Sequence, residues 1–317
     1  MARQWSGRLG QVDKCQVGVN LGDVSRRGQA LANLRLDLPQ EWTQGRQRCR
    51  AAGVPKHVKF QTRHAQALDM LDESGPLLPH RWIAGHDDMG RCGHFRESLR
   101  TRGERYLLAV PSNTLVRDGE VSPPEYSRRG RHPKVPWQRV DAWRASQPET
   151  AWTTLDVRDG EQGPLVIDVI KRRVQPRTPT GGTGPEDVLI ITREQQSDGT
   201  YKHDYSLSNA DADTPLKEFA RVAKAEHRIE ECFQRAKSEA GLGDYQVRNW
   251  IGWQHHQTLS LIAAWFLNDQ TRRGKNPDPR AHRSPRPPND RIPDRTPPPI
   301  PHPDPRRRDR PTLAPTQ

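Results

Sequence analysis

The stretch 228–267 constrains the fold of this chain more than any other part of the sequence. Its first half places apolar side chains at helical spacing, which predicts an amphipathic helix with the core-facing stripe Ile229, Cys232, Phe233, Ala236 and Ala240. Glu230 and Lys237 are seven residues apart, so they lie nearly above one another at the edge of that stripe. Such a pair could hold a metal ion and a phosphate, although a solvated helix face is the commoner outcome. The apolar run 259–267 predicts a second, buried helix.

The charge balance narrows the choice of partner. Lys and Arg number 51 against 39 acidic residues, a net charge of +12, which favours a polyanion such as nucleic acid. The four cysteines lack CxxC spacing, which argues against a zinc site or a disulfide framework. No apolar signal region follows Met1, and the run 259–267 is too short to cross a bilayer. We therefore expect a soluble cytoplasmic protein without a membrane partner.

Short apolar runs predict a strand–helix–strand unit in the first third of the chain. Strands at 82–84 and 106–110 flank a helix at 95–102, and such short connections form a parallel crossover. Because ligands bind at the carboxyl ends of parallel strands, we expect the chemistry at residues 85–88, GHDD. Upstream, the pattern predicts a hairpin of strands 15–21 and 30–38 and a helix at 58–73.

The sequence changes character after the crossover unit. Turn-rich sequence with strands expected at 166–169, 188–192 and 201–207 predicts a mostly β insertion. Trp137, Trp143 and Trp152 in it could stack on bases, but buried core tryptophans are commoner. We divide the chain into an N-terminal segment 1–111, the insertion 112–215, a helical segment 216–270 and a tail 271–317.

The tail has an unusual composition. It carries 14 of the 29 prolines and few apolar side chains, so it cannot bury a core, and we expect it to be disordered. Its basic clusters, such as the one at 306–308, could bind nucleic acid weakly through phosphates. Alternatively, the tail is a frameshift product, because GC-rich DNA translated out of frame yields Arg and Pro runs of this kind.

Several motifs in order carry a resemblance to a known family. They are CQVGVNLGDVSRRG (15–28), RWIAGHDDMGR (81–91), RYLLAVPSNTLVRD (105–118), SLSNA (206–210), AGLGDYQVRNW (240–250) and GWQHHQTLSLIAAWFL (252–267). Together with the Glu230–Lys237 pair, they resemble insertion-sequence transposases of the DDE superfamily, especially insertion-sequence family 701. The resemblance covers roughly residues 3–273.

The resemblance implies an RNase H-like catalytic core, interrupted by the β insertion, which cleaves DNA and transfers strands. Three carboxylates would hold two Mg²⁺ or Mn²⁺ ions that clamp the attacking and leaving oxygens. It also implies DNA as partner, both transposon ends and target, and a homodimer. Glu230 matches the third carboxylate, and Lys237 matches the lysine that contacts a DNA phosphate. Where relatives carry an Arg this chain has Glu226, and Arg228 is the substitute that we expect to contact DNA.

The position of the second carboxylate departs from the family pattern. Relatives read roughly G-D-D-E-x-G with the first acid as metal ligand, whereas this chain has His86 at that place, followed by Asp87 and Asp88. Imidazole is a poor ligand for Mg²⁺, so Asp87 is the expected metal ligand beside Glu230. Arg91 is a further expected DNA contact. Alternatively, the two aspartates cap the helix that follows.

The first carboxylate has no counterpart. In relatives it lies upstream of a stretch like the one at 2–7, so we expect an N-terminally truncated chain without the central strand of the sheet. Two half-sheets with unpaired edges would result. Asp13 and Asp23 are the nearest acids, and Asp23 is expected in a turn. Three hypotheses follow: an active metal-dependent transposase, a degenerate and catalytically inactive transposase that only binds DNA, and a fragment that does not fold stably.

Overall fold

The computed structural model describes residues 2–6, 10–25, 28–128, 130, 132–160, 163–245 and 247–275. The chain divides into two units, Met1–Gly274 and Lys275–Gln317, and the first of them contains the folded elements. The tail that we expected to be disordered lies outside the described residues from position 276 on. No helix among the described residues has both the length and the apolar character that a membrane span requires.

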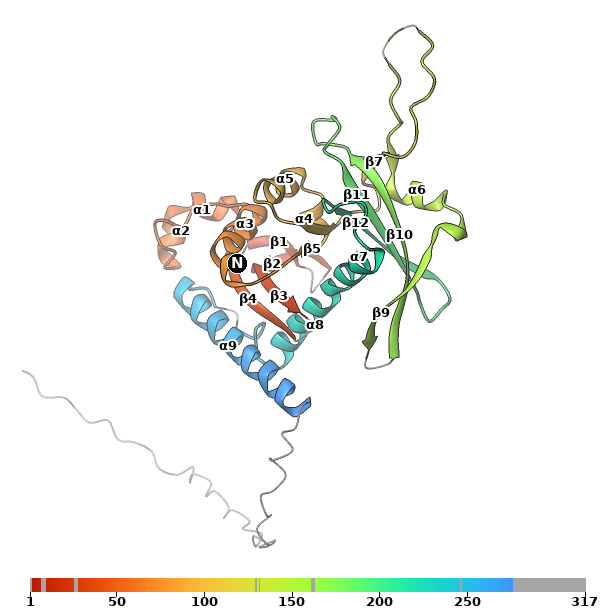
Figure 1. The fold of residues 1–317 in the computed structure, drawn as a ribbon. Coiled ribbons are helices and arrows are strands. Elements are labelled where there is room, and N and C mark those ends of the chain that lie inside the picture. Colours follow the sequence, from red (N-terminus) through yellow and green to blue (C-terminus); the bar gives the residue numbers. More distant parts are fainter. Residues whose placement is uncertain are drawn as a thin grey trace, which may run out of the picture. The chain divides into compact units, whose positions relative to one another are not determined.

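Runs of strands and runs of helices follow one another along the chain (Figure 1). The strands are β1 (Ala2–Ser6), β2 (Gln11–Cys15), β3 (Val17–Ser25), β4 (Gly28–Asp37), β5 (Ile83–Gly85), β6 (Tyr106–Ala109), β7 (Leu115–Asp118), β8 (Gln138–Arg139), β9 (Thr153–Gly160), β10 (Gly163–Pro176), β11 (Asp187–Gln195) and β12 (Tyr201–Ser208). The α-helices are α1 (Gln40–Gln44), α2 (Arg46–Ala51), α3 (Arg63–Ser74), α4 (Asp87–Gly90), α5 (Gly93–Thr101), α6 (Val140–Ala145), α7 (Leu216–Ala223), α8 (Ala225–Ser238) and α9 (Trp250–Lys275). Two 3-10 turns, Gly75–Leu77 and Glu149–Ala151, complete the described elements.

The largest sheet is mixed. Its strand order is β5-β6-β12-β11-β10-β7-β8, with β9 also paired to β10. Only the β5–β6 ladder in this sheet is parallel, and the helix α5 lies between the two strands in the chain. The predicted parallel crossover is therefore confirmed. Strands from the predicted insertion 112–215 share this sheet with β5 and β6 through the β12–β6 ladder. The domain boundaries themselves remain predictions.

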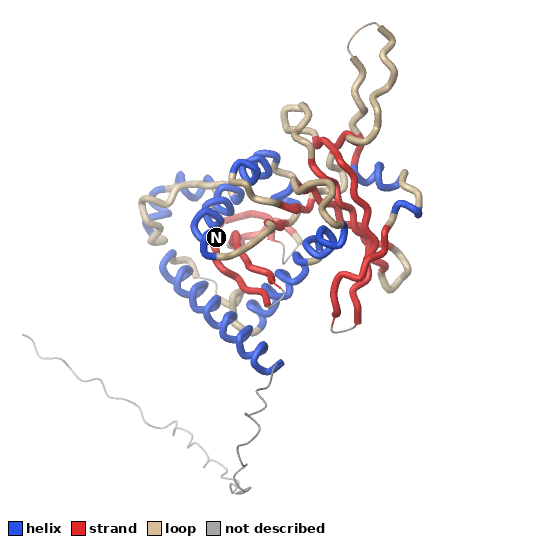
Figure 2. The backbone as a smooth tube through the Cα atoms, viewed as in Figure 1, coloured by secondary structure: helices blue, strands red, loops and turns tan. Residues whose placement is uncertain are grey.

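A hairpin of β3 and β4 forms a separate two-stranded sheet. This confirms the predicted hairpin, although both strands are shifted relative to 15–21 and 30–38. Asp23 lies inside β3 opposite Ala30, so the expectation that it is a turn residue was wrong. Figure 2 shows the long strands of the mixed sheet apart from this hairpin. Among the described strands, β3 pairs only with β4, and β5 pairs only with β6.

Both faces of the mixed sheet are covered, which explains its continuous apolar strands. Successive residues of β11 alternate between the two sides: Leu189 and Ile191 join a cluster with Trp143 of α6, and Val188 and Ile190 join one with Phe219 of α7. A strand buried on both faces reads as an unbroken apolar run. The predicted core position of Trp143 is confirmed. Trp152 and Trp137 are only partly buried, and each stacks under an arginine.

A buried ionic cluster ties α5 to the mixed sheet. The carboxylate of Asp187, at the start of β11, accepts hydrogen bonds from Arg100 and, at 2.9 Å, from the hydroxyl of Tyr106. Arg96 lies 3.9 Å from its other oxygen. Burial raises the pKa of Asp187 to about 6, and the two arginines oppose that rise. Burial likewise raises the pKa of Tyr106.

The helices α3 and α5 pack together over β6, with Leu68, Leu71, Phe95 and Leu99 in one cluster. α3 begins five residues later than predicted because Thr62 caps it, accepting the Ala65 N–H at 3.2 Å. α5 ends just before Gly103, whose φ of +73° suits glycine and ends the helix as predicted.

The helices α8 and α9 complete the unit beside the hairpin (Figure 1). α8 contacts β3 and β4 and also β5, the edge strand of the mixed sheet. The approach is close, since a Cβ on Gly22 would lie 2.4 Å from Cδ1 of Ile229. The predicted apolar stripe of α8 is confirmed for Cys232, Phe233 and Ala236. The prediction that the next helix is buried was wrong in part, because α9 buries only one face.

Candidate functional site

The GHDD segment follows the carboxyl end of β5, as predicted. Gly85 ends the strand and His86 is the N-cap of α4, its Nδ1 accepting the Asp88 N–H at 3.2 Å. Asp87 and Asp88 occupy the first turn, where the helix dipole favours carboxylates. α4 is therefore capped, as in the alternative interpretation of this segment, but the cap is His86 and not one of the two aspartates.

Each of the two aspartates has an arginine within ion-pair distance. The Asp87 carboxylate lies 2.8 Å from an Arg91 nitrogen, one helical turn later, with the two side chains about half exposed. The Asp88 carboxylate lies 3.7 Å from Arg63 of α3. Nε2 of His64, also on α3, lies 2.9 Å from the Asp88 carbonyl oxygen. Arg91, which we expected to contact DNA, thus has an ion-pair partner within its own helix.

Gly90 fixes how α4 sits on the sheet. A Cβ added there would lie 1.9 Å from the carbonyl oxygen of Ala109 in β6, so backbone meets backbone at this point. The Gly90 carbonyl in turn accepts a hydrogen bond from the buried Arg96 side chain. Only glycine permits this approach, which holds His86 and Asp87 at the end of β5.

Glu230 and Lys237 lie on the exposed face of α8. Both side chains are exposed, and the Lys237 ammonium lies 5.9 Å from the centre of the Phe233 ring. Arg228 has protein partners, donating to Oε1 of Gln29 at 3.0 Å and to the Ser25 carbonyl. It thereby anchors α8 to the two ends of the β3–β4 turn. Of the three predicted DNA contacts, Lys237 is exposed and has no carboxylate partner among the described ion pairs, whereas Arg91 pairs with Asp87.

The acids do not form the donor set that two divalent ions need. The structure places Glu230 on α8 and Asp87 on α4, and α8 contacts β5, the strand before α4. However, no group of three His, Cys, Asp or Glu side chains within the described ranges could hold a metal ion. Asp87 is already paired with Arg91, and His86 uses Nδ1 as a cap. The residues that the structure describes therefore do not fit a three-carboxylate metal centre.

One exposed basic segment was not predicted from the sequence. It comprises Arg46, Arg48 and Arg50 of α2 and Lys56 and Lys59 of the following loop, all exposed. No acidic residue occurs between Glu41 and Asp69, so the signal was present in the sequence as a local charge imbalance. Among the described ion pairs, Arg63 is the one basic side chain of the 42–68 stretch that has a carboxylate partner.

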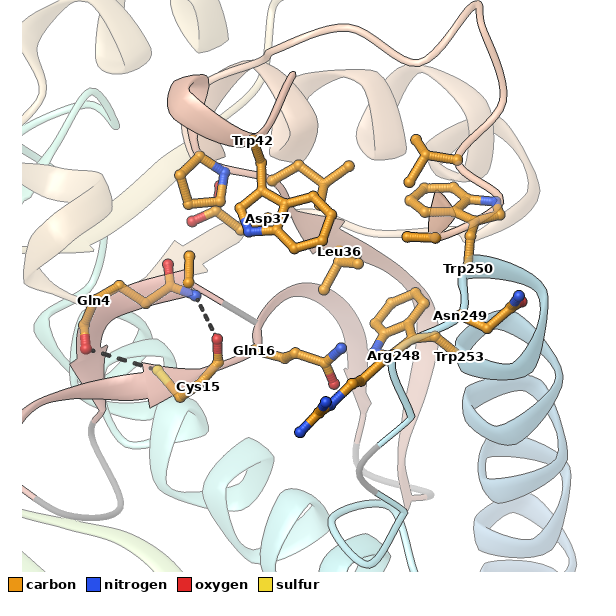
Figure 3. Close-up of a pocket in the computed structure, with 15 residues that line it drawn as sticks. Gln4, Cys15, Gln16, Leu36, Asp37, Trp42, Arg248, Asn249, Trp250 and Trp253 are labelled. Atoms are coloured by element: carbon orange, nitrogen blue, oxygen red, sulfur yellow. Dashed lines mark hydrogen bonds between the residues drawn. The ribbon is translucent and has the colours of Figure 1, made fainter. Parts of the chain in front are cut away.

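A small hollow lies next to the basic segment (Figure 3). Three indole rings, those of Trp42, Trp250 and Trp253, line it together with Arg248 and Gln16. Its volume is about 30 Å³, room for a water molecule and too little for a nucleotide base. The backbone N–H of Trp250 donates to the Ala52 carbonyl at 2.8 Å. The hollow is thus the seam where the start of α9 packs on the end of α2.

Arg48 contacts Trp42, one of the residues that line this hollow. Its guanidinium lies 4.6 Å from the centre of the Trp42 ring and donates to the Glu41 carbonyl at 2.6 Å. These contacts join α2 to α1. The other four cations of the basic segment remain directed to solvent.

Comparison with known proteins gives one family. The family model described as "DDE superfamily endonuclease" matches residues 1–164, just over half of the chain. The matched part contains β1 to β9, the GHDD segment and the basic segment, and it ends before Glu230 and Lys237. No curated protein matches the chain.

Proposed function

The chain belongs to the DDE superfamily endonuclease family, and on that basis we propose that it is a degenerate insertion-sequence transposase of the family 701 type, which binds DNA without cutting it. Members of this family generally use divalent metal ions to act on DNA. Under this proposal the chain binds DNA, the substrate of the family, but does not cleave it.

The arrangement of elements supports an RNase H-like core. The β3–β4 hairpin, the parallel β5–α5–β6 unit and the helix α8 follow one another along the chain, and α8 contacts both the hairpin and β5. The Glu230–Lys237 pair and the motifs after residue 164 support the finer assignment to insertion-sequence family 701. The pair lies on α8, and the motifs lie at the end of β12, between α8 and α9, and on α9. All of them are outside the part of the chain that the family model matches.

The exposed basic segment is the observation that carries DNA binding. Five Lys and Arg side chains lie within 14 residues, from Arg46 to Lys59, without an acid among them. Cations so placed neutralise phosphates and release condensed counterions, which is the main source of affinity for a duplex. Lys237 is the further phosphate contact that we propose, as a point charge on α8.

The acidic residues support the loss of cleavage. In-line phosphoryl displacement by two metal ions needs hard oxygen ligands held together. Here Asp87 is paired with Arg91, and an imidazole stands at His86. The remaining acid, Glu230, is one carboxylate on an exposed helix face. Asp87 and Glu230 alone do not supply the charge that two divalent ions require.

Incubation with supercoiled plasmid tests the proposal. We expect the purified chain to retard the plasmid in a gel but to produce no open circles in Mg²⁺ or Mn²⁺ above the level in EDTA. The physical reason is that Asp87 is paired with Arg91, that an imidazole stands at His86, and that no group of three acidic, His or Cys side chains among the described residues could hold a metal ion. Open and linear forms are quantified over time at several protein concentrations.

Two variants decide where any cleavage comes from. Glu230→Ala removes the remaining candidate ligand on α8, and Glu125→Ala removes an exposed acid that lies outside the family motifs. Metal-dependent nicking that Glu230→Ala abolishes and Glu125→Ala preserves would show an active transposase and refute the proposal. Absence of retardation at low salt would refute the DNA-binding part.

A further inference from the structure

The helix α9 has two faces of different character. One face packs on the unit: Trp253, Ser260 and Leu261 are buried. Polar bonds fix the same contact, since Nε1 of Trp265 donates to the Leu31 carbonyl at 2.6 Å and Asn268 donates to the Gln29 carbonyl at 2.8 Å. α9 is therefore held along much of its length by β4 and α8.

The opposite face is apolar and exposed. The side chains of Ile251, Leu259, Ile262 and Phe266 are 57, 66, 50 and 61 % exposed. With the exposed His255, which lies between Ile251 and Leu259, these side chains follow one another along α9 at intervals of four, four, three and four residues. They therefore form one line along the helix, which we call the outer stripe. At 100° per residue this line lies on the far side from Trp253 and Leu261. A contiguous apolar patch of this kind on a soluble unit marks an interaction surface.

The outer stripe has the periodicity of a coiled-coil seam. His255, Ile262 and Asp269 are seven residues apart, and Leu259, Phe266 and Arg273 form a second series with the same spacing. Alternating steps of three and four are the a and d positions of a heptad. The last two members differ from the rest, because Asp269 and Arg273 form an ion pair at 2.8 Å.

We propose that the outer stripe is the docking site for a second copy of this chain, with the two α9 helices antiparallel. In this alignment Leu259 packs against the partner's Ile262, and the reciprocal pair forms by symmetry. Phe266 then lies against the partner's His255. Each helix supplies both halves of the contact, so the stripe is complementary to itself.

Charge selects the antiparallel alignment. In a parallel pair Asp269 would face the partner's Asp269 and Arg273 the partner's Arg273, which places like charges opposite one another in successive layers. In the antiparallel pair Asp269 lies beside the partner's Gly252, in the first turn of α9. There the free N–H groups and the helix dipole favour a carboxylate, and glycine leaves room for it.

Sedimentation analysis of the full chain, without DNA, tests this inference separately from the proposed function. We expect the chain to dimerise reversibly, with a dissociation constant below about 50 µM. Ile262→Glu places a charge in both central layers and should weaken dimerisation by about 100-fold or more. Gln270→Glu adds the same charge at an exposed position off the stripe and should leave the dimer intact. Circular dichroism melts confirm that both variants fold, since all these side chains are exposed.

Disulfide formation between variants tests the orientation. A mixture of Leu259→Cys and Ile262→Cys chains should form a mixed disulfide, because these positions face each other in the antiparallel pair. Leu259→Cys alone should form no disulfide beyond the wild-type background. Disulfides in the Leu259→Cys chain alone would overturn the antiparallel alignment. A wild-type chain that stays monomeric, or an Ile262→Glu chain that dimerises like the wild type, would overturn the proposed surface.

Discussion

Replacing Gly90 by alanine is expected to destabilise the folded unit by about 3 kcal/mol or more. The new Cβ would lie 1.9 Å from the Ala109 carbonyl oxygen, far inside any real contact distance. Neither partner can yield cheaply, because Ala109 is paired with Ser206 of β12 in the sheet and Gly90 accepts the Arg96 hydrogen bond. A thermal melt followed by circular dichroism should show a midpoint lower by roughly 6–12 °C.

Gly93→Ala is the matched control for that melt. Gly93 is three residues later, at the first position of α5, and a Cβ there would meet its nearest neighbour, Cδ of Pro179, at an ordinary 3.6 Å. Alanine suits a helix better than glycine, so this variant should melt with the wild type or slightly above it. Equal midpoints for the two variants would contradict the close approach of α4 to β6.

Removing four charges from the basic segment is expected to weaken duplex DNA binding by about 100-fold at low salt. The variant combines Arg46→Gln, Arg50→Gln, Lys56→Gln and Lys59→Gln. These side chains are exposed and have no carboxylate partner among the described residues, so their loss removes phosphate contacts without breaking an ion pair. Arg48 is left in place because it stacks on Trp42. The affinity is measured by fluorescence anisotropy with a labelled duplex of about 30 base pairs.

A second quadruple variant separates the segment from net charge. Lys14→Gln, Lys134→Gln, Lys217→Gln and Arg221→Gln remove the same total charge from exposed positions elsewhere. We expect the affinity of this control for DNA to fall by less than about tenfold, because salt screens charges that are distant from the bound duplex. Equal losses in the two variants would show that affinity follows the overall charge and not the basic segment.

The crossover unit and the buried strands were predictable because their signals are local and strong. The run around 188–192 is apolar on both sides of the strand, and Gly103 marks the helix end before β6. The hairpin of β1 and β2 was not predicted. Most of its described side chains are polar or exposed, so no period-two apolar pattern marks the strands. β9 was missed because only Leu155 and Val157 carry its alternation.

The candidate site was predictable in its positions but not in its partners. The sequence places Asp87 after β5 and Glu230 on a helix edge, and the structure agrees with both placements. It could not show that His86 would cap α4 or that Arg91 would hold Asp87, since these contacts depend on side-chain geometry. The apolar run of α9 was interpreted as buried because sequence alone cannot tell a face that packs internally from one that awaits a partner.

The salt dependence of duplex binding by the unmodified chain tests the central claim most directly. If the chain binds DNA through the basic segment and Lys237, the logarithm of the association constant should fall linearly with the logarithm of the salt concentration, with a slope of about −4 or steeper. Affinity should drop by about 100-fold or more between 50 and 200 mM salt, roughly as that slope requires. Binding that does not change with salt, or no binding at low salt, would contradict the account.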